Sequence, residues 1–202
     1  VSFGYDVEAE RLLEEGDKIT GVAVRAGGRR EVLSADAYLI SMASYSPFLL
    51  ATVGVKVPIY PVKGYSITAP VKDATAAPTV CITDENGKIA MSRLGERLRM
   101  AGTAELAGYN PSVSEARCFG IADRMRQIFP NAVDHDNLKK WAGLRPATPS
   151  NVPLIGRTRY SNLYLNTGHG TLGWTLACGS GAAIADLISQ RVAEVDFPFL
   201  WG

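Results

Sequence analysis

An uncharged, glycine-rich segment near the C-terminus constrains this chain more than any other feature. Residues 160–185 contain five glycines and no Asp, Glu, Lys or Arg. Within this segment, residues 168–173 spell G-x-G-x-x-G between an apolar strand, Leu163–Leu165, and a helix expected from about Trp174 to Ser189. Glycines let the backbone approach a ligand, and the N-terminus of a helix favours negative charge. The pattern predicts a strand–turn–helix unit suited to an electron-rich ligand.

The same pattern occurs in dinucleotide-binding folds, but its context here differs. Such a motif begins a β-α-β unit and needs an acidic residue about 20 positions later, at the end of a second strand. Glu194 or Asp196 would supply the acid, yet too little chain follows for further crossovers. A glycine-rich turn that binds no ligand stays open as the alternative.

Composition excludes several classes of protein. The 202 residues carry 21 Lys and Arg against 20 Asp and Glu, a net charge of +1 that argues against nucleic acid or an anionic membrane as the main partner. The three cysteines are scattered, which fits a reducing compartment, and with two histidines they make a metal site improbable. The uncharged run 37–55 contains Pro47 and several serines, which favours a buried strand and a short helix over a membrane span.

Periodicity predicts an α+β fold with a mostly antiparallel sheet. Hairpins are expected within residues 3–32, and four short strands are expected at 66–69, 79–83, 89–93 and 97–102. Asn86-Gly87 predicts a two-residue hairpin turn between the second and third of these strands. Ser112 and Glu115 have the spacing of a capping box, followed by a helical apolar stripe that ends before Pro130. Cys118 lies in that stripe and is expected in the core.

Arg145 is the candidate ligand-binding side chain that local sequence singles out. It precedes Pro146, which favours an extended backbone, and its planar fork suits a carboxylate. Judged on the local sequence alone, a solvated surface arginine is the more common outcome.

Several motifs in one order resemble the C-terminal half of the FAD-dependent D-amino acid oxidase superfamily. Within that superfamily, the run 166–181 and the earlier motif 61–65 look most like the flavin-bearing small subunit of bacterial D-amino acid dehydrogenases. The resemblance covers nearly the whole chain. The motifs are Trp141–Pro146, Pro153–Gly156, Asn162–Gly170 and Gly173–Thr175, preceded by Pro61-Val62-Lys63-Gly64-Tyr65.

The resemblance implies roles for individual residues. Arg145 would pair with the α-carboxylate of the substrate, and Tyr65 would form part of the substrate wall, with packing between sheet and flavin domain as its alternative. The flavin would lie against a turn whose backbone N–H groups stabilise negative charge on the reduced ring. No catalytic acid or base and no metal ligand is implied. The residues of the flavin-binding turn would be Gly168, His169, Gly170, Thr171, Leu172, Gly173, Trp174 and Thr175.

The resemblance also implies a division of the chain. Residues 1–59 would be an incomplete edge of a Rossmann-like FAD domain, residues 60–140 a substrate-binding antiparallel sheet with a helix, and residues 141–202 a return to the FAD domain. Family members begin with a strand and a G-x-G-x-x-G motif for the adenosine diphosphate part of FAD, and this chain begins with a later hairpin. It therefore looks like a C-terminal fragment that does not retain FAD by itself.

For the intact enzyme the resemblance implies oxidation of D-amino acids to 2-oxo acids and ammonia. Electrons would pass through FAD to a respiratory acceptor such as a quinone, in the cytoplasm, with peripheral association with the inner membrane left open. Two alternatives stay open as well. One is a related flavin amine oxidase acting on glycine or sarcosine, and the other is a non-catalytic domain that binds a partner.

Overall fold

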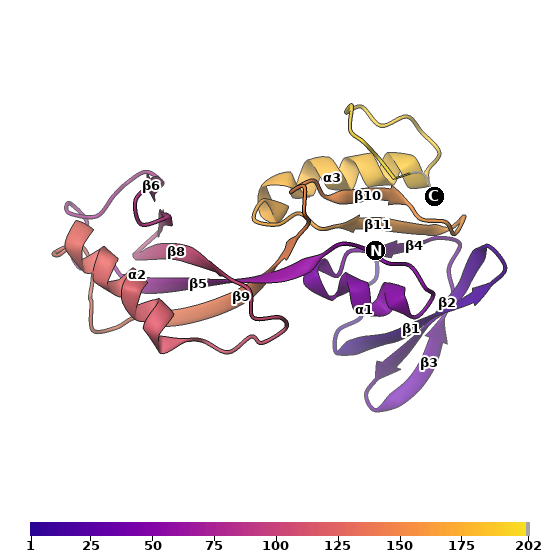
Figure 1. Ribbon diagram of the computed structural model, residues 1–202, viewed down its shortest axis with the longest axis horizontal. Helices are drawn as coiled ribbons and strands as arrows, with labels where there is room; N and C mark the ends of the chain where they lie inside the picture. Colours follow the sequence, from indigo (N-terminus) through magenta and orange to yellow (C-terminus); the bar gives the residue numbers. More distant parts are fainter. Residues whose placement is uncertain (201–202) are drawn as a thin grey trace. The chain divides into compact units, whose positions relative to one another are not determined.

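The computed structural model describes residues 1–200 and divides them into two compact units (Figure 1). Residues 1–60 and 146–200 form unit 1, and residues 61–145 form unit 2. The chain therefore passes from one unit to the other twice, at 60/61 and at 145/146. The boundaries predicted from the sequence are 59/60 and 140/141. Each unit is described separately.

Unit 1 contains two small sheets. The first is an antiparallel meander of β1 (Val7–Glu15), β2 (Lys18–Ala26) and β3 (Arg29–Leu33). Tight turns join its strands, and Gly16 in the first turn has φ +61°, a conformation that glycine adopts without steric cost. The hairpins expected within residues 3–32 are therefore confirmed.

The second sheet of unit 1 has the order β10-β11-β4. In it β11 (Leu163–Thr167) pairs parallel with β4 (Tyr38–Ile40) and antiparallel with β10 (Leu154–Arg157). The long helix α3 (Gly173–Ile188) lies alongside β10 and β11 (Figure 1). After β4 come a 3-10 turn, η1 (Ala43–Tyr45), and the short helix α1 (Ser46–Ala51), so the run 37–55 forms the expected strand and helix.

The core of unit 1 lies between these elements, and hydrogen bonds of polar side chains hold the elements together around it. The buried Tyr160 hydroxyl donates to the Val53 carbonyl at 2.9 Å, and the Asn162 amide oxygen accepts from the backbone N–H of Ile19 at 2.8 Å. Buried polar groups need such partners. The Asn162 bond holds the meander against the segment that leads into β11, and the Tyr160 bond holds the chain that follows α1. The core side chains are Leu12, Ile19, Tyr38, Ile40, Leu49, Leu50, Val53, Tyr160, Leu163 and Leu165.

Unit 2 is a five-stranded sheet with one helix. The order is β6-β7-β8-β5-β9, and the β6/β7, β7/β8 and β8/β5 pairs are antiparallel. Helix α2 (Glu115–Ile128) packs on the sheet through Cys118, Ile121, Ala122 and Met125, which confirms Cys118 as a core thiol. The strands are β5 (Tyr60–Pro70), β6 (Ile82–Asp84), β7 (Ile89–Leu94), β8 (Arg97–Glu105) and β9 (Lys139–Ala147).

Two local predictions in unit 2 are wrong. The connection between β6 and β7 is a four-residue turn, 85–88, in which Lys88 has φ +52°, so Asn86-Gly87 does not form a two-residue hairpin turn by itself. The helix is capped by Ser114 and not by Ser112, because Ser114 has the extended backbone of an N-cap and its hydroxyl accepts from the N–H of Arg117 at 3.5 Å.

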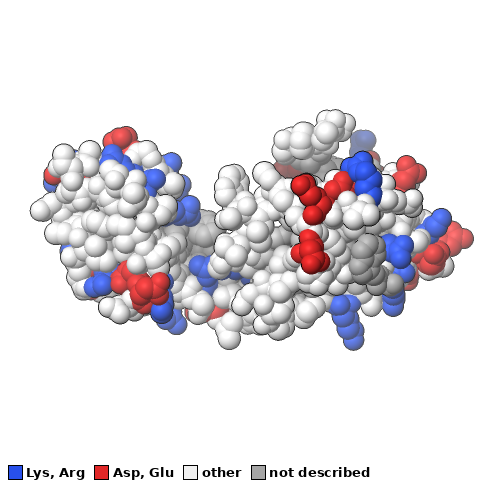
Figure 2. Space-filling model, turned by 90° about the horizontal axis from the view of Figure 1, so that it is seen from above, with Lys and Arg blue, Asp and Glu red and all other residues white. Residues whose placement is uncertain are grey.

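The fold class, a mixed α and β structure with mostly antiparallel sheets, agrees with the prediction. Within residues 1–200, no helix is both long enough and apolar enough to cross a membrane. In the view of Figure 2, acidic and basic side chains are scattered in small groups among broad uncharged areas, with no large field of one sign.

Candidate functional site

Arg145 is a half-buried cation on β9, in unit 2. The extended backbone expected before Pro146 is present. Its Nη1 donates to the carbonyl of Thr103, on β8, at 2.8 Å. Desolvation lowers the pKa of Arg145, but an arginine stays protonated at neutral pH. No Asp or Glu among residues 1–200 forms an ion pair with Arg145, so the fork has donors available for an external carboxylate.

The Arg145 guanidinium lies against the backbone of Gly64, on β5. A Cβ atom at Gly64 would stand 2.2 Å from Arg145 Cζ, far inside the distance that two carbon atoms tolerate. The motif Pro61–Tyr65 and the motif Trp141–Pro146, which are distant in sequence, thus meet at this point. The sequence motif does not by itself single out Gly64. The signal that points to it is its place inside a strand, where a glycine often marks a bulge or the close approach of another group.

Tyr65 lies in the core of unit 2. Its side chain is 1 % exposed and packs among the apolar residues that α2 covers. Its hydroxyl donates to Glu105 Oε2 at 2.5 Å. Because the Tyr65 side chain is this buried, a substrate could contact almost none of its surface in this structure. Packing therefore accounts for the aromatic ring, and nothing here supports the predicted role of Tyr65 in the substrate wall.

A buried lysine accompanies Tyr65. Lys63 is 3 % exposed on its side chain, and its ammonium lies 3.1 Å from Glu105 Oε2 and donates to the Ser112 carbonyl at 3.2 Å. Hydrogen bonding with Tyr65 and then with Glu105 raises the pKa of Lys63, against desolvation. The Tyr65 and Lys63 hydrogen bonds lower the pKa of Glu105. Lys63 and Glu105 therefore neutralise each other, and the uncharged Tyr65 hydroxyl donates a further hydrogen bond to the carboxylate.

The predicted flavin-binding turn belongs to unit 1. Gly168 and Gly170 have φ +80° and +54°, which explains why glycine occupies both positions. The N–H of Gly170 donates to the Pro146 carbonyl at 2.9 Å, and the N–H of Leu172 donates to the His169 carbonyl at 3.0 Å. These bonds fix the turn between β11 and α3.

Helix α3 begins at this turn without a side-chain cap. Leu172 is the N-cap residue, no side chain accepts a hydrogen bond there, and the first turn carries no acidic residue. The N-terminal N–H groups of a helix have no partner within the helix, so this end presents donors and partial positive charge. Thr171, Trp174 and Thr175 are exposed, and Trp174 most of all at 96 %.

Two polar side-chain atoms beside the turn are buried without a hydrogen-bond partner among residues 1–200. They are Nε2 of His169 and Oδ1 of Asn166. Desolvation lowers the pKa of His169, which keeps its imidazole neutral at pH 7. Buried polar atoms normally have partners. Two unsatisfied atoms beside an uncapped helix start fit a site that holds a ligand with both donors and acceptors, as an isoalloxazine ring has.

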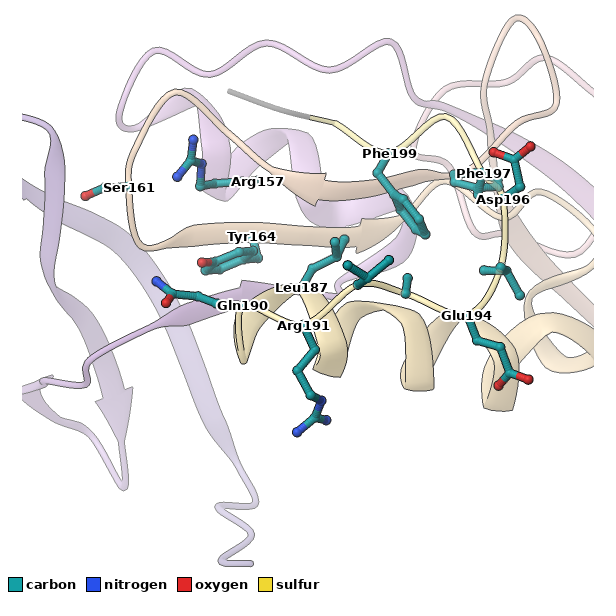
Figure 3. Close-up of a pocket in the computed structure, with 13 residues that line it drawn as sticks. Arg157, Ser161, Tyr164, Leu187, Gln190, Arg191, Glu194, Asp196, Phe197 and Phe199 are labelled. Carbon is teal, nitrogen blue, oxygen red and sulfur yellow. The ribbon is translucent and has the colours of Figure 1, made fainter.

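Unit 1 also contains a cavity of about 760 Å³ that none of the predicted site residues lines. It lies between β10, β11, the end of α3 and the segment 190–199 (Figure 3). Figure 3 shows the rings of Tyr164 and Phe199 directed into this space, whereas Arg191 and Glu194 point outward. Among the described residues, no group of His, Cys, Asp and Glu suits a metal ion, and all three cysteines are free.

These features fit a chain that contributes to an FAD-binding fold, and comparison with known proteins identifies the family. A family model described as FAD dependent oxidoreductase, abbreviated DAO, matches residues 1–187. The chain belongs to this FAD-dependent oxidoreductase family.

Curated relatives in the family carry a more particular name. The chain is 54 % identical over 201 residues to a D-amino acid dehydrogenase of Dechloromonas aromatica (strain RCB), covering 99 % of this chain and 48 % of the relative. It is 50 % identical over 196 residues to a D-amino acid dehydrogenase of Xanthobacter autotrophicus, covering 97 % of this chain and 46 % of the relative. The chain thus spans about half the length of the curated relatives that it matches.

Solved structures show the same fold at lower identity. A glycine oxidase from Geobacillus kaustophilus superposes with a TM-score of 0.79 at 23 % identity, covering 95 % of this chain and 50 % of that structure. A glycine oxidase from Bacillus cereus gives a TM-score of 0.76 at 26 % identity, with 92 % and 50 % covered.

Proposed function

We propose that this chain supplies the substrate-binding sheet and the flavin-binding turn of an FAD-dependent D-amino acid dehydrogenase. The observation that carries the proposal is Arg145, a half-buried cation without a carboxylate partner among residues 1–200, whose guanidinium is held in one place by Gly64 and Thr103. The relatives' name and their 45–54 % identity support a D-amino acid as the molecule that provides this carboxylate.

The reaction is an oxidative deamination. A hydride leaves the α-carbon and a proton leaves the amino group, which gives an imino acid; water then hydrolyses the imino acid to a 2-oxo acid and ammonia. Bound FAD supplies the hydride acceptor. Arg145 binds the carboxylate through two parallel N–H···O bonds and so orients the α-carbon.

The uncapped start of α3 and the turn 168–175 would hold the flavin ring and would stabilise negative charge there. Backbone N–H groups need no reorganisation to do this, because the turn bonds of Gly170 and Leu172 already hold them in place. The neutral imidazole of His169 shapes the turn and exchanges no proton with the substrate. No acid or base from this chain is assigned to the reaction.

Substitution of Arg145 tests the proposal. We expect Arg145→Ala in the full-length protein to raise KM for D-alanine by about tenfold to a hundredfold, since hydrogen bonds to charged groups contribute about 1.5–3 kcal/mol. Arg97→Ala, which removes an exposed arginine from β8, is the matched control and should leave KM unchanged. An unchanged KM in the Arg145 variant would contradict the assignment.

A glycine-type amine oxidase is the second candidate, because the structural neighbours include two glycine oxidases. Their identity of 23–26 % is well below that of the D-amino acid dehydrogenases, which favours the first candidate. Rates of flavin reduction by D-alanine, L-alanine, glycine and sarcosine distinguish the two. The first candidate requires D-alanine to be fastest.

The electron acceptor belongs to the same proposal. Relatives named dehydrogenases suggest a respiratory acceptor such as a quinone, reached by a peripheral association of the full-length protein with the inner membrane from the cytoplasm. We expect D-alanine to drive reduction of a soluble quinone analogue much faster than consumption of oxygen. Faster oxygen consumption would assign the protein to the oxidases.

A further inference from the structure

A β-bulge faces Gly64 at the point where Arg145 crosses the sheet. On either side of it, Lys63 pairs with Glu105 and Tyr65 pairs with Gly102. A single residue of β5, Gly64, is therefore opposed by two residues of β8, of which Thr103 is one. Bulges of this kind change the direction of local groups and occur often beside active sites.

Thr103 adopts a backbone conformation that is rare for its residue type. Its φ is +69°, in the left-handed region, which a β-branched residue seldom enters. Such conformations persist only where the surrounding structure imposes them, and they concentrate at functional sites. The backbone conformation of Thr103 bears directly on Arg145, because the Thr103 carbonyl accepts the hydrogen bond from Arg145 Nη1 at 2.8 Å.

Gly64 provides the matching space on the opposite strand. The ideal Cβ position of Gly64 lies 2.2 Å from Cζ, 2.2 Å from Nη2 and 2.3 Å from Nη1 of Arg145. Because the three distances are nearly equal, the guanidinium plane covers the place where any other side chain would begin. The glycine is therefore required by the position of Arg145. Its own backbone does not require it, since its φ is outside the left-handed region.

We propose that Gly64 and the Thr103 bulge are positioning residues that hold the guanidinium of Arg145 in the one orientation that binds a carboxylate with two bonds. This inference rests on the proposed function, in which Arg145 binds the α-carboxylate of the substrate. An arginine side chain has many rotamers, and ordering it on binding costs affinity. Gly64 and Thr103 order the Arg145 side chain before the substrate binds, while the remaining N–H donors of the guanidinium stay available.

Gly64→Ala is the direct test. The contact that it creates is with the movable end of a side chain, so the full-length protein should fold and keep its flavin while the guanidinium is displaced. We expect KM for D-alanine to rise about tenfold, the effect of losing one charge-assisted bond, with kcat changed much less. Calorimetry should show the Kd for propionate, which has the carboxylate and no amino group, weakened by a similar factor. Gly120→Ala on α2, where a Cβ meets nothing within 4 Å, should change neither value.

A double-mutant cycle separates positioning from general damage to the sheet. In Arg145→Ala the space beside Gly64 is empty, so the added methyl group has room. If Gly64 acts through the guanidinium, adding Gly64→Ala to Arg145→Ala causes no further rise in KM. If Gly64→Ala raises KM by the same factor in the wild type and in Arg145→Ala, the inference is overturned. It is also overturned if KM is unchanged in Gly64→Ala although Arg145→Ala raises it. The proposed function would survive both results. If Arg145→Ala itself leaves KM unchanged, the proposed function fails first.

Thr103 is tested through its backbone. Deletion of Thr103 removes the bulge and displaces the carbonyl that accepts from Arg145 Nη1. We expect it to raise KM for D-alanine and to weaken the Kd for propionate as Gly64→Ala does. Unchanged values in a deletion variant that keeps its flavin would overturn this part of the inference.

Discussion

Individual residues near the two candidate sites differ in how their charge is balanced. Arg145 has no carboxylate partner among residues 1–200, whereas Lys63 is neutralised by Glu105 inside the same sheet. A buried ion pair of this kind contributes little net stability, but loss of one partner leaves a buried charge. The contrast separates a cation that is available to a ligand from one that holds the sheet together.

His169 makes a prediction about pH. Burial lowers its pKa in the folded protein below the ordinary value near 6.5, so the unfolded chain binds a proton more readily. The stability that the neutral imidazole retains at pH 7 is therefore lost as the pH falls from about 6.5 through the folded pKa. We expect His169→Gln to flatten this part of the pH dependence, measured as urea midpoints of the full-length protein from pH 7.5 to 5. Parallel curves for the two proteins would contradict the assignment.

Secondary-structure elements show why the sequence predicted some features and not others. The meander, β11 and α2 have strong local signals, namely glycine turns, an apolar run and a helical apolar stripe. The strands β9 and β10 have no such local signals, because Gly143, Pro146 and Gly156 interrupt their sequences. Pairing within the sheet gives these segments their extended conformation. The contact of Gly64 with Arg145 joins positions 81 apart in the chain, 145 minus 64, and a single sequence does not report such a contact.

The start of α2 gives a prediction at this scale. Ser114 caps the helix through its hydroxyl, whereas the hydrogen bonds of Ser112 are made by its backbone: its carbonyl accepts from Lys63 and its N–H donates to Asn110 Oδ1 at 2.9 Å. We expect Ser114→Ala to lower the free energy of unfolding by about 1 kcal/mol or somewhat less, given the long 3.5 Å bond, and Ser112→Ala to have almost no effect. Urea denaturation of the two variants measures the difference. Equal losses would mean that the capping residue is wrongly assigned.

At the scale of the whole molecule, unit 1 exposes several large apolar side chains and the edge of a strand. Trp174 is 96 % exposed, Phe48 is 56 % exposed, and Leu39 on β4 is 42 % exposed. Among the strands described for residues 1–200, β4 pairs on one edge only, although parallel strands are normally buried within a larger sheet. An unpaired sheet edge is commonly covered by another part of a protein. The curated relatives are about twice as long as this chain, and we expect their additional residues to include such a part.

A comparison of this chain with the full-length protein tests that view. Flavoproteins bind the diphosphate of FAD with a glycine-rich backbone and the N-terminus of a helix. Among the described residues, we identify the turn 168–175 as an element of this kind, and we assign it to the flavin ring. We expect the 202-residue chain, purified alone, to show no visible flavin band and to enhance the fluorescence of an apolar dye strongly. The full-length protein should be yellow and enhance the dye weakly, because the added part covers Trp174 and the free edge of β4. If the isolated chain retains FAD in a one-to-one ratio, the phosphate-binding element lies within these residues and the proposed division between the two parts of the enzyme is wrong.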